Sequence, residues 1–179
     1  MTRYVALLRG INVGGNNLIR MPALRTAFEE SGFANVSTYI QSGNVLFDAP
    51  DARSRELTQR IEAMLAHAFD YVPTVVVRNR RQMRTVIHRA PRGFGSLPAR
   101  YRYDVIFLKE PMTAAAAKKH VPTNPAVDTA QAGPGVLYFS RLTAKATASR
   151  LSRIVSSSIY SSITIRNWNT TTKLLQLME

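Results

Sequence analysis

Segments that are apolar at every position alternate along this chain with segments of helical periodicity, and this alternation constrains the fold most. Inside the segment 3–9 all five side chains between the two arginines are apolar, namely Tyr4, Val5, Ala6, Leu7 and Leu8. A strand that is apolar on both faces belongs in the middle of a sheet that is covered on both sides. The segment 103–108 is also apolar on both faces, apart from Asp104, so we expect two buried central strands.

The first part of the chain predicts strand, helix, strand, strand, helix and strand. Apolar stripes at helical spacing indicate the helices, and clusters of Gly, Pro and Asn indicate the turns. The predicted elements are a strand at 3–9, a helix at 21–31, short strands at 36–40 and 45–47 joined by the turn 41–44, a helix at 53–69 and a strand at 74–77. This order is that of the ferredoxin-like unit.

From residue 79 the pattern begins again, more loosely. It predicts a helix at 79–88, a loop at 89–100, a strand at 103–108, a helix at 113–120, a hairpin of 126–131 and 136–139, a helix at 147–155, an irregular serine-rich stretch at 156–162 and a last helix capped by Asn169. This order is close to that of the first part, although no residue-level repeat is visible.

We therefore expect an α+β protein of two ferredoxin-like βαββαβ-type halves with mainly antiparallel sheets. Because the strands are apolar on both faces, the simplest cover for the face away from the helices is the other sheet, and the halves should share one core. The expected organisation is a first half at 1–78, a basic helix and linker at 79–102, and a second half with the C-terminal helix at 103–179. The side chains expected in the core include Val5, Leu7, Val76, Ile106, Phe107 and Phe139.

The composition excludes several classes of function. The chain has 179 residues and no cysteine, which rules out a disulfide scaffold, a thiolate zinc site and a cysteine nucleophile. No apolar run approaches a membrane span and the first residues lack the plan of a signal peptide, so we expect a cytoplasmic protein with no membrane partner. The three histidines lack metal-ligand spacing, and we expect neither a metal nor a cofactor.

A strong positive charge favours polyanionic partners. The formal net charge is +13, and the stretch between Asp70 and Asp104 holds eight arginines and no acidic residue. Charge runs commonly form no more than a solvated surface, so that interpretation stays open. The alternative is a nucleic-acid or polyanion site, for which the candidate residues are Arg78, Arg80, Arg81 and Arg84.

The βαββαβ order places three conspicuous loops at one end of the first half: 10–17, 41–44 and 70–73. Glycine-rich turns expose backbone amides that can hold an anion. The candidate ligand-binding residues at this end are Arg9, Asn12, Gly14, Gly15, Asn16, Gln41, Ser42 and Asn44. In the alternative interpretation, Gly and Asn merely supply positive φ angles in tight loops. The spacing matches neither a Walker A loop nor a dinucleotide fingerprint.

A second conspicuous segment, Arg166-Asn167-Trp168-Asn169, lies near the C-terminus. Its structural interpretation makes Trp168 a buried anchor and Asn169 a helix N-cap. Its functional interpretation adds Arg166 and Asn167 to the anion site, in which case both should approach the glycine-rich loop in space. No carboxylate pair accompanies either segment, so acid–base catalysis has no evident carrier and enzymatic activity stays open.

Three segments together resemble one family. Leu7–Gly15, Thr38–Phe47 and Thr164–Thr170 are similar to motifs of the bacterial family called Domain of Unknown Function 1697, in the same order and across nearly the whole chain. The resemblance implies a cytoplasmic α+β protein of two ferredoxin-like parts and brings no established activity, substrate or catalytic residue. The family's usual acidic residues between the second helix and the middle strand are replaced here by arginine.

Three functions remain as hypotheses. The first is binding of a small anionic ligand by the conspicuous loops, the second is binding of nucleic acid or another polyanion by the arginine-rich segment, and the third is a scaffold that binds protein partners. The first predicts stabilisation by a particular metabolite and the second a steep dependence of affinity on salt.

Overall fold

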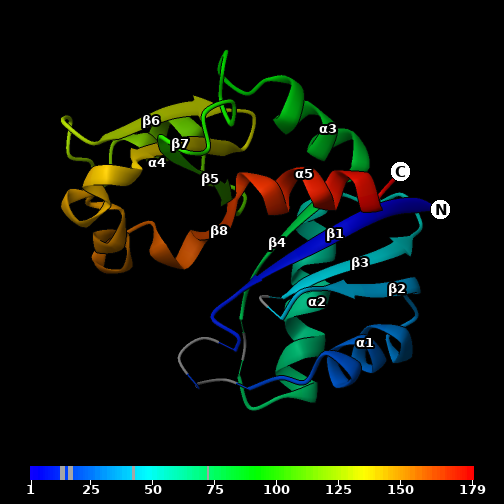
Figure 1. The fold of residues 1–179 in the computed structure, drawn as a ribbon. Coiled ribbons are helices and arrows are strands. Elements are labelled where there is room, and N and C mark those ends of the chain that lie inside the picture. The colour runs from blue at the N-terminus through cyan, green and yellow to red at the C-terminus, as the bar shows by residue number, and fades with distance from the viewer. Residues whose placement is uncertain (13–14, 16–17, 42, 72) are drawn as a thin grey trace. The chain divides into compact units, whose positions relative to one another are not determined.

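The computed structural model of the chain describes residues 1–12, 15, 18–41, 43–71 and 73–179. The chain forms two compact units, each built on a four-stranded sheet (Figure 1). The first unit comprises residues 1–83 together with the last six residues, 174–179, and the second unit comprises residues 84–173.

The first unit has the predicted βαββαβ order. Its elements are β1 (Thr2–Arg9), α1 (Met21–Glu30), β2 (Ala34–Tyr39), β3 (Asn44–Ala49), α2 (Ser54–Ala68) and β4 (Thr74–Asn79). The strands are ordered β2-β3-β1-β4, and each neighbouring pair is antiparallel. This order places β1 in the middle, as its two-sided apolar sequence predicts, with β3 beside it.

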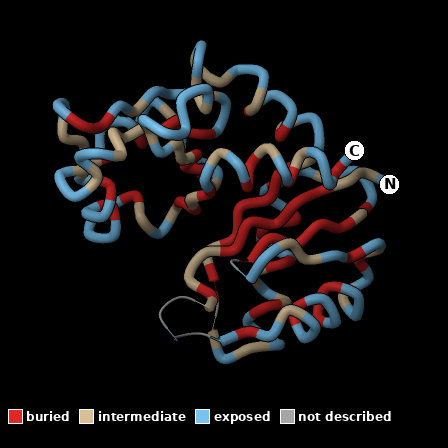
Figure 2. The backbone as a smooth tube through the Cα atoms, viewed as in Figure 1, coloured by how far each residue is buried: buried red, intermediate tan, exposed pale blue. Residues whose placement is uncertain are grey.

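Strand β1 is buried along most of its length (Figure 2), with buried side chains on both faces of the sheet. Tyr4, Ala6 and Leu8 join one core cluster with the apolar stripes of α1 and α2. The ring of Phe47 lies at the centre of this cluster, with centroids 4.7 Å from Phe33 and 5.6 Å from Tyr4. Val5 and Leu7 point to the opposite face and are equally inaccessible to solvent.

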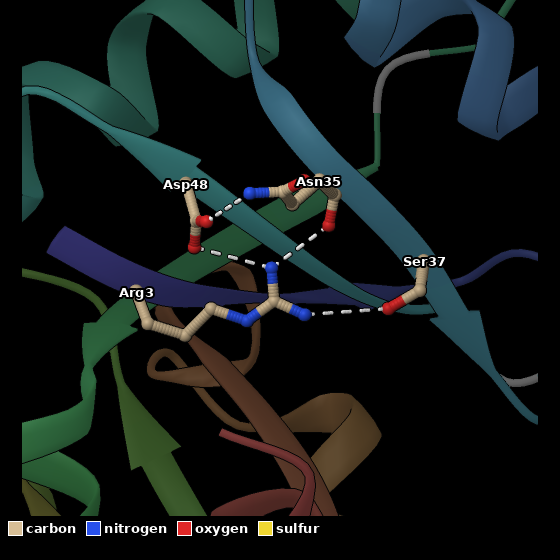
Figure 3. A network of polar contacts seen from close by, with 4 residues as sticks. All are labelled: Arg3, Asn35, Ser37 and Asp48. Carbon is tan, nitrogen blue, oxygen red and sulfur yellow. Dashed lines mark hydrogen bonds and ion pairs between the residues drawn. The ribbon is translucent and has the colours of Figure 1, made fainter. Parts of the chain in front are cut away.

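A polar network secures the edge of this sheet (Figure 3). The guanidinium of Arg3 donates to the carbonyl oxygen of Asn35 at 2.8 Å and to Asp48 Oδ1 at 3.2 Å, and it reaches Ser37 Oγ at 3.5 Å. Asn35 Nδ2 in turn donates to Asp48 Oδ2 at 2.6 Å. The β2–β3 register shifts between Ala34 and Ser37, so the network spans a bulge and holds the edge strand across it.

The second unit repeats this strand order. Its elements, together with the helix that leads into it and the helix that leaves it, are α3 (Arg80–His88), β5 (Tyr101–Leu108), α4 (Ala114–Lys118), β6 (Asp128–Gly133), β7 (Val136–Leu142), three 3-10 helices (Thr143–Ala148, Leu151–Ser156 and Tyr160–Ser162), β8 (Ile163–Asn167) and α5 (Trp168–Leu177). The strands are ordered β6-β7-β5-β8 and are antiparallel. A second core cluster of its own includes Ile106, Leu137 and Phe139.

One predicted element of this unit was wrong, and one strand was missed. The helix expected at 147–155 is replaced by 3-10 turns, which place Leu151, Ile154 and Ile159 in the core. Hydroxyl side chains compete with the backbone for hydrogen bonds in this region, as when Ser157 Oγ donates to the Ile154 carbonyl at 2.6 Å. Strand β8 was not predicted, although it supplies the fourth strand of the sheet.

The predicted fold class is confirmed: the chain is an α+β protein with two four-stranded antiparallel sheets. All six side chains that were named for the core are buried, each with at most 1% of its surface exposed. The packing of one sheet against the other stays a prediction. None of the helices among the described residues combines the length and the apolar character that a membrane crossing needs.

Candidate functional site

The three loops predicted to meet at one end of the first unit do meet there, and we call this region the loop end. Asn12, which follows β1, joins the first loop to the second. Its Nδ2 donates to the carbonyl oxygens of Ile19 at 2.9 Å and Gln41 at 3.0 Å, while its Oδ1 accepts from the Ile19 N–H at 2.8 Å. Asn12 has a left-handed φ of +52°, which asparagine tolerates better than most residues.

The third loop is joined to the first through Arg9 and Tyr71. Arg9 Nη2 donates to Thr74 Oγ1 at 2.8 Å, and the hydroxyl of Tyr71 reaches the Arg9 carbonyl oxygen at 3.5 Å. Gly10 leaves room for this contact, since a Cβ there would lie 2.3 Å from the Tyr71 hydroxyl. The first loop is therefore in contact with each of the other two loops.

The structure separates the predicted ligand-binding residues of this end into groups. Gln41 and Gly15 are exposed and Arg9 is half-buried. Asn44 was expected in the turn 41–44 but begins β3 and is fully buried, and its Nδ2 donates to the Tyr39 carbonyl at 2.9 Å. Gly14, Asn16 and Ser42 lie outside the described residues.

Arg166 is a buried arginine within β8. Only 7% of its surface is exposed, and its Nη1 donates to Thr164 Oγ1 and to the Ile165 carbonyl oxygen, both at 2.8 Å. Burial lowers the pKa of its guanidinium to about 10, so the group is charged at neutral pH. These contacts give Arg166 a role inside the second unit. Its approach to the loop end, like that of Asn167, stays a prediction.

Asn167, rather than Asn169, caps the last helix. Asn167 Oδ1 accepts from the Thr170 N–H at 2.7 Å, which is the N-cap contact, and the helix begins at Trp168. The Trp168 ring packs edge-on against Phe94 at 5.1 Å, so it anchors the loop before β5 to the start of α5. The anchor predicted for Trp168 is present, although the ring is only half-buried.

Replacement by alanine should lower the stability of the protein at Asn167, the N-cap, and hardly change it at Asn169. We expect Asn167→Ala to lower the free energy of unfolding by about 1 kcal/mol, the usual value of an N-cap side chain. Asn169→Ala, two residues further into the helix and exposed, should change stability by less than about 0.5 kcal/mol. Urea denaturation of both variants makes the comparison, and equal losses would contradict the assignment of the cap to Asn167.

The candidate arginines for polyanion binding lie on two different elements, the end of strand β4 and helix α3. Arg78 lies in that strand and only 5% of its surface is exposed. It was named as a candidate for binding a polyanion, but its side chain is buried. Arg80, Arg81 and Arg84 are exposed on α3, whose Met83 and Val86 are buried. Asn79 and Gln82 form a capping box at its start: each side chain accepts from the other residue's backbone N–H at 2.8 Å.

Two polar residues of the loop end were not predicted from the sequence, namely Tyr71 and Thr74. The sequence did place the loop 70–73 at this end of the unit. Neither tyrosine nor threonine, however, is a residue type that by itself suggests an anion site. Among the described residues there is no group of three or more His, Cys, Asp or Glu side chains that could hold a metal ion.

Comparison with known proteins gives a family and no activity. The family model described as "Protein of unknown function (DUF1697)" matches residues 1–138. The chain belongs to this family. Among solved structures, the DUF1697 chain is similar to that of the conserved bacterial protein SP0830 from Streptococcus pneumoniae, with 24% identity and a TM-score of 0.84 over 99% of this chain and 98% of that chain. This likeness supports the fold alone. No curated protein matches.

Proposed function

We propose that this DUF1697 protein binds a small anionic ligand at the loop end of its first unit. The observation that supports the proposal is the way Asn12 ties the first and second loops together at the end of β1, the strand that ends at Arg9. Ligand sites on loops require a rigid scaffold, and the three hydrogen bonds of Asn12 supply one.

The loop end offers the chemistry that an anion needs. Arg9 brings a half-buried guanidinium, whose position is fixed by Thr74. Gly15 is exposed with a φ of +78°, and nothing lies within 4 Å of the position that its Cβ would take. Gly10 and Asn12 also have left-handed φ angles, and turns that include left-handed residues can present their N–H groups to an anion.

A thermal-shift screen tests the proposal. Phosphorylated and carboxylated metabolites should include at least one that raises the melting temperature of the wild-type protein in a concentration-dependent way, because a ligand that binds only the folded state stabilises it. The same compound should stabilise Arg9→Gln much less. A screen in which no anion stabilises the wild type, or in which Arg9→Gln responds equally, would contradict the proposal.

The exposed face of α3 supports polyanion binding as a second candidate. Arg80, Arg84 and His88 are spaced four residues apart on one side of the helix, beside Arg81. If three arginines each contact a phosphate, the log–log slope of affinity for a duplex against salt should be about −3. Replacing Arg80, Arg81 and Arg84 by Glu should remove the binding without unfolding the protein, whereas a slope near zero would reject this candidate.

A further inference from the structure

Each of the two sheets has two edge strands, which are β2 and β4 in the first unit and β6 and β8 in the second (Figure 1). An edge strand carries backbone N–H and C=O groups that no neighbouring strand uses, and these groups can pair with another chain. Proteins usually block such edges. Among the described residues, three of the four edges are blocked by contacts within their own unit, whereas β6 is open.

The edges of the first unit are blocked on both sides of the sheet. On β2, the bulge interrupts the regular ladder, and the Asn35 carbonyl oxygen already accepts from Arg3 Nη1 at 2.8 Å. On β4, the Val75 N–H donates to Glu62 Oε1 at 3.3 Å, so a side chain of α2 takes the place of a partner strand.

The strands β4 and β8 hold corresponding places in the two sheets and share a second device. Each has a buried arginine one residue before its end, Arg78 in β4 and Arg166 in β8. Each arginine donates through Nη1 to the carbonyl oxygen of the preceding residue, Val77 at 2.9 Å and Ile165 at 2.8 Å. Both edges are thereby occupied by the chain's own side chains.

The backbone of β6 is available in comparison. The Leu142 N–H donates to the Val127 carbonyl oxygen at 3.1 Å, which makes these two residues a hydrogen-bonded pair. Hydrogen-bonded pairs alternate along an antiparallel ladder, so the N–H and C=O groups of Ala130 and Ala132 point away from β7. Among the described residues these groups have no hydrogen-bond partner.

The side chains of β6 leave this edge accessible. Ala132 is exposed and Ala130 is half-buried, and the pairing of β6 with β7 runs without a register shift. The one charged residue of the strand, Asp128, is buried and accepts from the N–H groups of Asn124 and Arg150 at 2.8 and 2.9 Å. The strand therefore lacks the proline, the exposed charge and the bulge that commonly protect an edge.

The surroundings of this edge are strongly basic. The second unit contains fourteen lysines and arginines and three acidic residues. Of the acidic residues Glu110 is exposed, whereas Asp104 has only 14% of its side chain exposed and Asp128 is buried. Lys118 and Lys119 are exposed at the end of α4, the helix that packs against β6.

We infer that β6 is the docking edge for an extended, acidic peptide segment of a partner protein. The segment adds to the sheet as a fifth strand, exchanging backbone hydrogen bonds with Ala130 and Ala132. Its acidic side chains are attracted by the basic surface of the unit, which selects this partner over others. The same charge disfavours pairing with a second copy of this chain, because that would bring two basic units together.

The amides of Ala130 and Ala132 report on this edge directly. We expect the peptide acetyl-Glu-Thr-Glu-Val-Glu-Thr-amide to shift both backbone ¹⁵N–¹H resonances together until they saturate. Hydrogen exchange of both amides should slow about tenfold or more at saturation, because each N–H enters a hydrogen bond.

Two control peptides separate the causes of binding. The peptide acetyl-Lys-Thr-Lys-Val-Lys-Thr-amide has the same strand pattern with the opposite charge and should bind about tenfold more weakly or less. The acidic peptide with every backbone nitrogen methylated keeps its charge but has no N–H to donate, and it should leave both resonances in place.

Two kinds of variant test the edge and its charge. Ala132→Pro removes an N–H that the β6–β7 ladder does not use, so it should abolish the response of Ala130 to the acidic peptide. Lys119→Glu should weaken binding of the acidic peptide about fivefold. Lys173→Glu makes the same change of charge on α5, which follows β8 at the far edge of the sheet, and should bind as the wild type does. Arg9→Gln should also bind normally, which separates this edge from the loop end.

The inference is overturned if the acidic peptide leaves the two alanine resonances unmoved, or if either control peptide shifts them equally. It is equally overturned if Lys119→Glu and Lys173→Glu bind the peptide alike. Exchange of these amides that slows with protein concentration alone would assign the edge to a second copy of the chain and so contradict the acidic partner.

Discussion

Replacement of Gly43 by alanine should lower the free energy of unfolding by about 2 to 4 kcal/mol. Gly43 has a φ of +82°, which an alanine adopts only at a cost. Its added Cβ would also lie 2.7 Å from Ile11 Cδ1 and 2.9 Å from Leu8 Cβ. The Gly43 carbonyl accepts from the Leu8 N–H at 2.8 Å, so a backbone shift that relieved the clash would disturb the contact between β1 and the turn.

Gly15 provides a matched control in the neighbouring loop. Its φ of +78° is nearly the same, but nothing lies within 4 Å of the position of its Cβ. Gly15→Ala should therefore cost only the backbone strain, about 1 to 2 kcal/mol. Urea denaturation measures both losses of stability. The slope of the unfolding free energy against urea concentration should be the same in both variants and in the wild type. If the two variants lose the same stability, the close approach of the turn to β1 is not present in solution.

The second large effect is expected at Gly95, in the loop before β5. An added Cβ would lie 2.2 Å from Nε1 of Trp168 and 2.4 Å from its Cδ1. The indole cannot move away easily, because it packs against Phe94. Gly95 also has a φ of +84°, so Gly95→Ala combines overpacking with backbone strain and should cost about 2 to 4 kcal/mol.

Gly93 separates these two causes within the same loop. Its φ is +79°, and the nearest atom to its Cβ position is Ser96 Oγ at 3.6 Å, an ordinary contact distance. Gly93→Ala should therefore cost about 1 to 2 kcal/mol. The indole ¹⁵N–¹H resonance should move in Gly95→Ala and stay in place in Gly93→Ala. A Gly95→Ala protein with wild-type stability would show that the loop does not press on Trp168.

The βαββαβ order and the meeting of the three loops could be predicted from the sequence, because both depend on local patterns. Apolar runs marked β1 and β5 as buried strands, and the direction of successive elements placed the loops 10–17, 41–44 and 70–73 at one end. The end of the unit at which each loop lies follows from the alternating directions of strands and helices, without knowledge of individual contacts.

Other features depended on contacts that are distant in sequence. Arg78 looked like part of a basic surface, but its position in β4 buries it. Asn169 was predicted as the N-cap of the last helix, but β8 ends at Asn167 and the cap lies there. One cavity of the second unit is lined by Gly95, Pro98 and residues 101–104 together with Arg141 and Trp168, and no spacing in the sequence relates these segments.

The most direct test of the proposed function is a titration of the protein with inorganic phosphate, followed through the backbone ¹⁵N–¹H resonances of Gly10, Gly15 and Gln41. The proposal predicts that these three resonances shift together and saturate. It also predicts that Arg9→Gln weakens the binding about tenfold and that Arg9→Lys, which keeps the charge, weakens it less. Resonances that do not move, or a phosphate affinity that is the same in wild type and Arg9→Gln, would contradict anion binding at the loop end.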